Sequence, residues 1–408
     1  MVLAWQGALF SMRPFKRGMK VSAFSLVATS ERKLGRSRRW ASMAAFDPVD
    51  SEKPAELLDP QTLHNGTIPY PTALSPSAIL EFQKCPQSYL FQYLYKLKQP
   101  TSLALAKGSM LHHALEQVYD LQPAERDLST LQNLFRRVWS QNRESDVYRD
   151  LFATPEAARD LAMESVWGRE GLQLLQNYVR LENPQAVTRP NPVQREIWVR
   201  AHLTIDSSQG ATGYVLPGRK PQATSTPNNK DAAAFLVRGI VDRLDMVRTP
   251  ESKQAVLQIV DYKTGKAPHL KYSAGMNQKI RDEALFQLQI YALLLREKQL
   301  QKQQQFEDDA AASSQTLPVR FLRLLYLTNV NDQAETLDMD LGATPLERDS
   351  RLQDVHAQIS TVWNSIIDMV SRQDPHAFVG CDRSFCYCHK CRSRFVPGSV
   401  WEPPVEPT

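Results

Sequence analysis

Two apolar runs that each end in charged residues constrain the fold of this chain more than any other feature. The first run covers residues 237–245, and the second begins eleven residues later and covers residues 256–265. β-Branched and aliphatic side chains fill both runs, and Pro250 and Gly265 supply the breaks that end them, as is typical of buried strands. Two such strands with a short connection predict a hairpin.

The charged residues of this hairpin are predicted to share one small volume. Residues two apart along a strand point to the same face, so Asp261 and Lys263 project together while Tyr262 turns away. Asp242 is predicted to lie across the hairpin from them. Converging carboxylates repel each other unless a divalent cation or the lysine neutralises them. The hairpin by itself fits two interpretations, a hard-metal site or ordinary solvated residues at strand ends.

Five ordered segments distinguish between these interpretations, because together they resemble a known family. They are Ser75-Pro76-Ser77 leading into Cys85-Pro86, Gly108-Ser109-Met110-Leu111-His112, Gly239-Ile240-Val241-Asp242-Arg243, Asp261-Tyr262-Lys263, and Gln287-Leu288-Gln289-Ile290-Tyr291. Over residues 72–395 the chain resembles the PD-(D/E)XK nuclease superfamily. More narrowly, it resembles the RecB-type branch, which includes the RecB and AddB nuclease domains and exonuclease V.

The resemblance implies a restriction-endonuclease-like α/β (α+β) fold, with a mixed central sheet flanked by helices. It divides the nuclease domain into a helical region over residues 72–190, a catalytic core over 191–330 and a C-terminal helix with a cysteine-rich segment over 345–395. The implied activity is metal-dependent phosphodiester hydrolysis, as in a DNA exonuclease of repair or recombination. Asp242 and Asp261 would coordinate Mg²⁺ or Mn²⁺, with the carbonyl of Ile259 or Tyr262 as a further ligand, and Lys263 would position the attacking water.

Four further residues are candidates for this site. The resemblance places His112 near the metal, and Glu116 lies one turn further along the same predicted helix. Glu196 is either another metal ligand or a solvent-facing strand residue. Gln287 and Tyr291 are four residues apart on one helical face, where they would contact phosphate or orient Lys263. Alternatively, Tyr291 is part of an apolar stripe.

The five cysteines are divided between Cys85 near the start of the domain and a late group of Cys381, Cys386, Cys388 and Cys391. The resemblance implies a four-iron four-sulfur cluster held by Cys85 and three of the late cysteines. The late spacing, C-x4-C-x-C-x2-C, departs from the family pattern of Cys-x-x-Cys with a later third cysteine, and leaves those three ligands open. One zinc ion held by the four late cysteines is an alternative, and disulfides are a third.

The patterning of apolar residues predicts the order of the elements. Helices are expected over residues 75–98, 103–121, in one or two pieces of 128–182, and over 281–302. Strands are expected over residues 193–205, 235–247, 256–263 and 319–328. Two polar inserts, residues 206–234 and 299–316, are expected to be flexible. The spacer 47–71 is predicted to be a linker, and residues 396–408 a tail.

The ends and the charge of the chain suggest a compartment and partners. Residues 1–46 hold nine Lys and Arg and one acid, Glu31, which predicts a disordered mitochondrial or plastid transit peptide cleaved near residues 41–44; a basic tail is the alternative. The net charge is +5, so the remaining chain carries about −3, and any DNA-binding surface must be a local patch. No stretch is apolar enough for a membrane span.

The expected partner is DNA, as single strands or ends. The chain has no Walker-type phosphate loop, so a helicase motor would have to be a partner. A non-catalytic nucleic-acid-binding or scaffold protein that keeps the nuclease fold is the alternative function. The complete Asp242, Asp261 and Lys263 set favours activity.

Overall fold

The computed structural model describes residues 67–97, 99–155, 157–186, 191–205, 234–305, 317–328 and 335–396. Several predictions therefore lie outside the described residues: the transit peptide over 1–46, the linker up to residue 66, the inserts over 206–233 and 306–316, and the tail from residue 397. Most of the nuclease domain predicted from the sequence lies within the described residues.

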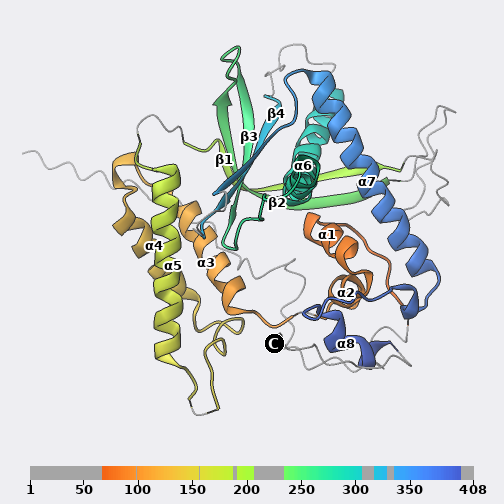
Figure 1. The fold of residues 1–408 in the computed structure, drawn as a ribbon, viewed down its shortest axis with the longest axis horizontal. Helices are drawn as coiled ribbons and strands as arrows, with labels where there is room; N and C mark the ends of the chain where they lie inside the picture. Colours follow the sequence, from red (N-terminus) through yellow and green to blue (C-terminus); the bar gives the residue numbers. More distant parts are fainter. Residues whose placement is uncertain are drawn as a thin grey trace, which may run out of the picture. The chain divides into compact units, whose positions relative to one another are not determined.

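A five-stranded mixed sheet forms the centre of the described domain (Figure 1). Its strands lie in chain order: β1 (Gln194–Thr204), β2 (Ala234–Arg248), β3 (Ala255–Lys263), β4 (Val319–Tyr326) and β5 (Thr336–Asp340). β3 and β4 are parallel and every other neighbouring pair is antiparallel. A parallel pair requires a crossover, which the helix α6 (Ala274–Gln305) supplies. The predicted α/β fold class is confirmed.

Helices lie on both sides of this sheet. Besides α6, the α-helices of the described residues are α1 (Pro76–Lys84), α2 (Pro86–Tyr89), α3 (Leu103–Val118), α4 (Leu128–Asn142), α5 (Leu161–Glu182), α7 (Pro345–Ser371) and α8 (Cys388–Phe395). A π-helical turn, Leu90–Leu94, follows α2. Figure 1 shows α3, α4 and α5 grouped on one side of the sheet, and α1, α6 and α7 on the other. The buried apolar residues accordingly form two clusters, one on each side.

The two clusters meet on strand β3, whose side chains alternate between them. Ile259 packs in the cluster around α6, whereas Val260 and Tyr262 pack in the cluster formed by α3, α4 and α5. This alternation follows from the two-residue period of a strand. It places Asp261 and Lys263 on one face, as the sequence predicted, and this face is directed toward α6.

Local sequence signals explain how the N-terminal helices begin. The hydroxyl of Ser75 accepts a hydrogen bond from the amide of Ala78 at 3.2 Å, and Pro76 occupies the first turn of α1. Cys85 and Pro86 then divide the predicted helix 75–98, because Cys85 is extended and caps α2 through its sulfur. The bend turns Cys85 inward, where it is buried.

The structure differs from the predicted elements at both ends of α6 and at β5. Helix α6 begins at Ala274, seven residues before the predicted start, because Ser273 caps a first turn that has no apolar stripe. The same helix continues to Gln305, three residues past its predicted end at 302 and into the insert predicted over 299–316. The strand β5 was not predicted; it has only five residues, with Leu337 and Met339 buried between exposed positions. Among the described residues, no helix is both long and apolar enough to span a bilayer.

Candidate active site

The hairpin of β2 and β3 brings the two predicted catalytic carboxylates together. Its register pairs Arg243 with Val260, which sets Asp242 opposite Asp261. The carboxylate of Asp242 accepts a hydrogen bond from the backbone amide of Tyr262 at 3.2 Å. Both acids therefore lie at the open end of the hairpin, just beyond the last paired residues of β2 and β3.

Lys263 connects the hairpin to helix α6. Its ammonium lies 2.7 Å from the carboxylate of Asp261 and donates a hydrogen bond to Oε1 of Gln287 at 3.2 Å. The amide nitrogen of Gln287 donates to the hydroxyl of Tyr291 at 3.1 Å. Gln287 thus restricts the direction of the Lys263 ammonium. This is one of the two roles predicted for Gln287.

Gly239 permits this arrangement by letting α6 approach the sheet. A Cβ atom at Gly239 would lie 2.7 Å from Cε1 of Tyr291 and 3.2 Å from Cδ of Pro76. No side chain fits there without displacing Tyr291. The glycine in the Gly-Ile-Val-Asp-Arg motif is therefore a packing requirement of the site.

His112 reaches the carboxylates from α3, on the other side of the sheet. Its Nε2 lies 3.0 Å from the carbonyl oxygen of Tyr262 and its Nδ1 lies 3.3 Å from the carboxylate of Asp242. A carbonyl oxygen only accepts, so this hydrogen bond requires the proton on Nε2 and leaves Nδ1 facing Asp242 as a possible ligand atom. The Tyr262 carbonyl, a predicted metal ligand, is thus engaged by His112.

Glu196 completes a group of potential ligands with His112 and Asp242. One ligand atom of each of the three residues lies within 4.8 Å of the others. Glu196 is in β1 but has a φ of 46°, in the left-handed region that non-glycine residues rarely adopt. Its atom Oε2 is buried and has no hydrogen-bond partner among the described residues. A strained backbone and an unsatisfied buried oxygen both indicate a functional position.

The carboxylates of the site are poorly compensated by protein cations. Burial, together with the charges of Asp242, Glu116 and Asp261, raises the pKa of Glu196 to about 9. Burial raises the pKa of Asp242 to about 6, although His112 opposes the shift. Burial also raises the pKa of Glu116, which the sequence indicated only by its spacing of four residues from His112 on α3. Such a cluster is stabilised by a bound cation.

Lys263 behaves differently from the acids. Burial opposes its charged form, but the carboxylates of Asp261 and Asp242 outweigh burial and raise the pKa of the ammonium. Lys263 is therefore a cation at neutral pH and can donate hydrogen bonds but cannot accept a proton. Asp261, which was predicted as a metal ligand, is held by this ion pair and stands beside the group of His112, Glu196 and Asp242.

The opposite face of the hairpin contains a buried ionic network with a structural role. Arg243 is 1% exposed and donates hydrogen bonds to the hydroxyl of Tyr262 at 2.8 Å, to Glu182 at 2.8 Å and to Asp245 at 2.9 Å. Because Glu182 ends α5, the network fastens the helical region to the hairpin that carries the site.

A second cluster of potential ligands is formed by cysteines. The sulfur atoms of Cys85, Cys381, Cys386 and Cys388 lie within 4.8 Å of one another, whereas Cys391 is buried outside this group. A zinc site made of the four late cysteines is therefore wrong, because the group contains Cys85 in place of Cys391. All five cysteines are free thiols, so the disulfide alternative is also contradicted.

Arg392 connects this cysteine group to the N-terminal helices. Its guanidinium donates to Oε1 of Gln87 at 2.7 Å and to the sulfur of Cys388 at 3.4 Å. Cys85 comes from the bend between α1 and α2, and Cys388 begins α8. An ion or cluster bound by the four sulfurs would thus join the two ends of the domain.

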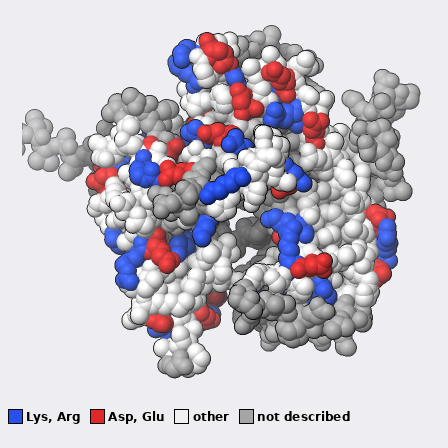
Figure 2. Space-filling model, in the orientation of Figure 1, with Lys and Arg blue, Asp and Glu red and all other residues white. Residues whose placement is uncertain are grey.

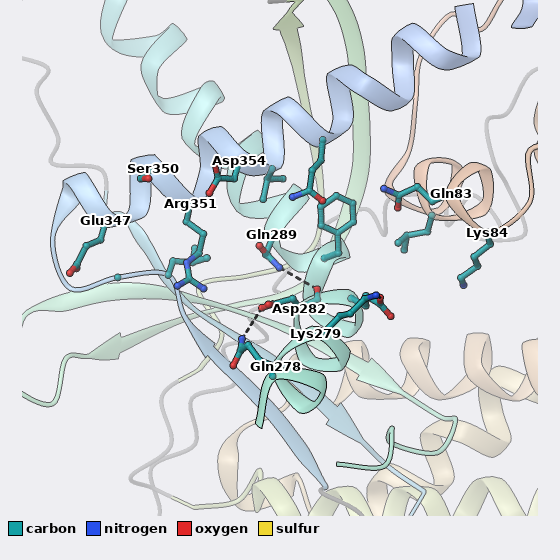
Figure 3. Close-up of a pocket in the computed structure, with 18 of the residues that line it drawn as sticks. Gln83, Lys84, Gln278, Lys279, Asp282, Gln289, Glu347, Ser350, Arg351 and Asp354 are labelled. Carbon is teal, nitrogen blue, oxygen red and sulfur yellow. Dashed lines mark hydrogen bonds and ion pairs between the residues drawn. The ribbon is translucent and has the colours of Figure 1, made fainter. Parts of the chain in front are cut away.

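A separate hollow of about 1760 Å³ lies between α1 and the N-terminal ends of α6 and α7 (Figure 3). It is lined by residues of both charges, namely Lys84, Lys279, Arg351 and Arg383 with Asp282, Glu283, Glu347 and Asp354. Charges of both signs are also interspersed over the face in Figure 2. No group of potential metal ligands lies in this hollow among the described residues. We therefore place the active site at the carboxylates.

The comparison with known families agrees with the fold. The family model of the PD-(D/E)XK nuclease superfamily matches residues 73–396, which is most of the chain. The chain belongs to the PD-(D/E)XK nuclease superfamily. No curated protein matches it.

Proposed function

We propose that this protein is a metal-dependent DNA nuclease of the RecB type, which hydrolyses phosphodiester bonds as an exonuclease in DNA repair or recombination. Superfamily membership supports a nuclease. The observation that carries the proposal is the convergence of His112, Glu196 and Asp242 beside the ion pair of Asp261 and Lys263. The buried oxygen Oε2 of Glu196, which has no hydrogen-bond partner among the described residues, also supports a bound cation at this site.

The donor set fits a divalent cation such as Mg²⁺ or Mn²⁺, because it offers carboxylate oxygens and one imidazole nitrogen. His112, Glu196 and Asp242 would hold the ion, with Asp261 beside them. When bound, the ion would neutralise charge on the scissile phosphate and lower the pKa of a water molecule.

Lys263 supplies a positive charge beside these carboxylates. As an ammonium it donates hydrogen bonds to the attacking water or to a phosphate oxygen, and so stabilises the negative charge that develops in the transition state. Gln287 restricts the direction of this ammonium, and Tyr291 in turn holds Gln287. His112 keeps its Nδ1 toward the acids because the Tyr262 carbonyl fixes its other nitrogen.

Cleavage of end-labelled DNA in Mg²⁺ or Mn²⁺ tests this function. We expect the wild-type protein to release short products, and Asp261→Ala and Lys263→Ala to abolish release while circular dichroism shows an intact fold. Lys279→Ala is the matched control, because its side chain is 70% exposed on α6. Cleavage that persists in both site variants would reject the assignment. DNA binding without cleavage by the wild-type protein would favour the non-catalytic alternative.

We also propose that Cys85, Cys381, Cys386 and Cys388 hold a four-iron four-sulfur cluster, as the family resemblance implies. A single zinc ion held by the same four sulfurs is the alternative, because four thiolates around one ion form a common structural zinc site. Anaerobically purified protein with a cluster would show a broad visible absorbance and contain iron. Colourless protein with one equivalent of zinc would support the alternative.

Two proposals concern the setting of the reaction. We propose that residues 1–46 direct the protein to mitochondria or plastids, and a fluorescent fusion of residues 1–60 would reveal the compartment. We propose that a separate helicase or repair protein supplies unwound DNA, because the sequence has no phosphate-binding loop of its own. Co-purification from the organelle that the fusion identifies would test this second proposal.

A further inference from the structure

Strand β1 changes the face that it presents at Glu196. Ile197 and Val199 pack in the cluster around α6, whereas Arg195 contacts α3 on the other side of the sheet. In a regular strand, residues two apart share one face, so Arg195 and Ile197 would point the same way. Of the residues of β1, Glu196 alone has no partner in the register with β2, and its φ of 46° accounts for the reversal. This conformation is costly for a glutamate, so a contact must hold it.

Arg195 joins this point of β1 to the end of α3. Its guanidinium donates hydrogen bonds to the backbone carbonyl of Glu116 and, at 2.7 Å, to the carboxylate of Asp120. The Glu116 carbonyl lies in the last turn of α3, where its hydrogen bond from the amide of Tyr119 is long, at 3.4 Å, and leaves it free to accept another. The negative end of the helix dipole also attracts a cation there.

The two elements that Arg195 joins carry two of the proposed metal ligands. His112 lies one turn before Glu116 on α3, and Glu196 directly follows Arg195 on β1. Glu116, Arg195 and Glu196 all line one hollow of about 450 Å³ at this junction. The guanidinium therefore fixes α3 relative to the reversed end of β1, and with it the spacing between His112 and Glu196.

We propose that Arg195 is a positioning residue for the metal site. Its contact with the end of α3 holds the left-handed backbone of Glu196, and so keeps the Glu196 carboxylate in the group that it forms with His112 and Asp242. The inference rests on the proposed nuclease function, because the ion is the one assigned to that function. Without the guanidinium, the backbone of Glu196 can return to the extended region, which redirects its side chain. In this role Arg195 touches no reacting atom.

The affinity for Mn²⁺, measured from the electron paramagnetic resonance signal of the free ion, tests the role. We expect Arg195→Ala to weaken Mn²⁺ binding about 10- to 100-fold, as is typical when a residue that orients a metal ligand is removed. Arg195→Lys keeps the charge but not the forked donor, so it should recover only part of the affinity. Arg200→Ala is the matched control, because Arg200 is an exposed arginine of the same strand, and it should leave the affinity unchanged.

A double-mutant cycle distinguishes positioning from a general loosening of the fold. If Arg195 acts through Glu196, adding Arg195→Ala to Glu196→Ala should not further weaken the Mn²⁺ binding that His112 and Asp242 retain. An equal loss with and without Glu196 would overturn the role, and so would an unchanged affinity of the single variant Arg195→Ala.

The backbone conformation can be tested without any metal. Glu196→Gly and Glu196→Ala both remove the carboxylate, but only glycine adopts the left-handed region at no steric cost. In urea unfolding of chelator-treated protein, we expect the glycine variant to have a folding constant about 5- to 30-fold larger than that of the alanine variant. This advantage should disappear when Arg195→Ala is added, because the backbone is then free to relax. An advantage that persists at full size would show that Arg195 does not hold the backbone.

Failure of the positioning role can be distinguished from failure of the nuclease function. If the wild-type protein cleaves DNA and binds Mn²⁺, and Arg195→Ala does both equally well, only the positioning role is rejected. If Mn²⁺ binding depends on Arg195 but the wild-type protein cleaves no DNA, the positioning role is supported and the nuclease function is rejected. A wild-type protein that binds no Mn²⁺ would reject both.

Discussion

Replacement of Glu196 by glutamine is expected to stabilise the metal-free protein, by an amount that grows with pH. The pKa of Glu196 in the folded state is raised to about 9, whereas its ordinary value is 4.5. Below pH 4.5 the carboxyl is protonated in both states and contributes nothing. Between pH 4.5 and 9 the folded state holds a proton that the unfolded state releases, so stability falls as the pH rises. Glutamine resembles the neutral form and avoids this loss.

The size of the effect follows from the shift in pKa. Each pH unit corresponds to about 1.4 kcal/mol, so the full penalty at pH 7.5 is about 4 kcal/mol. Glu196 is only partly shielded from solvent, and screening reduces the expected penalty to about 2 kcal/mol. Urea unfolding of chelator-treated protein at pH 5.5 and pH 8.5 measures the difference. The difference in the free energy of unfolding between the variant and the wild type should be larger at the higher pH.

A bound cation should reverse the order of stability. Mn²⁺ at 100 times its Kd stabilises the folded protein by about 2.7 kcal/mol, and Glu196→Gln should lose most of this gain because it lacks a ligand charge. Glu283→Gln is the matched control, since its carboxylate is 68% exposed on α6. The assignment of Glu196 to the group of metal ligands would be refuted by either of two results. One is a difference in unfolding free energy between Glu196→Gln and wild type that does not change with pH, and the other is an equal stabilisation of these two proteins by Mn²⁺.

Three further predictions concern the supports of the two sites. Gly239→Ala should destabilise the protein by about 1 to 3 kcal/mol in urea unfolding and reduce the cleavage rate, because its new methyl group displaces Tyr291. Cys391→Ser should retain the bound metal, whereas Cys381→Ser should lose it, as measured by iron or zinc per chain. Arg243→Leu should cost about 3 to 5 kcal/mol in thermal unfolding, because it leaves its buried carboxylate partners without a cation.

Much of the sheet could be predicted because the hairpin has a strong local pattern. Apolar runs with clear breaks defined β2 and β3, and the strand period alone placed Asp261 and Lys263 on one face. The early part of α6 has no such pattern, since the residues from Ala274 to Arg281 have no apolar stripe and the packed face begins near Leu285. Only the capping residue Ser273 indicated that start. β5 was too short for its alternation to be distinctive.

The features that complete the active site depend on tertiary contacts that a sequence pattern does not contain. Glu196 was an undecided candidate because an acid in a strand usually faces solvent, and its left-handed backbone has no signal in its residue type. Likewise, the spacing of the cysteines could not show which four of the five form the ligand group. That choice depends on where the bend at Cys85 meets the C-terminal segment.

Two groups of residues support the active site from opposite sides of the sheet, and this explains why they occur in the family motifs. Gly239 and Gln287 act on the α6 side of the hairpin, where they set the approach of the helix and the direction of Lys263. Arg243 and His112 act from the α3 and α5 side, where they fix the helical region to the same two strands. The site therefore depends on both layers being docked on the sheet at once. A variant that loosens the packing of either layer should reduce cleavage although it substitutes no carboxylate of the site. Gly239→Ala and Arg243→Leu test the two layers separately.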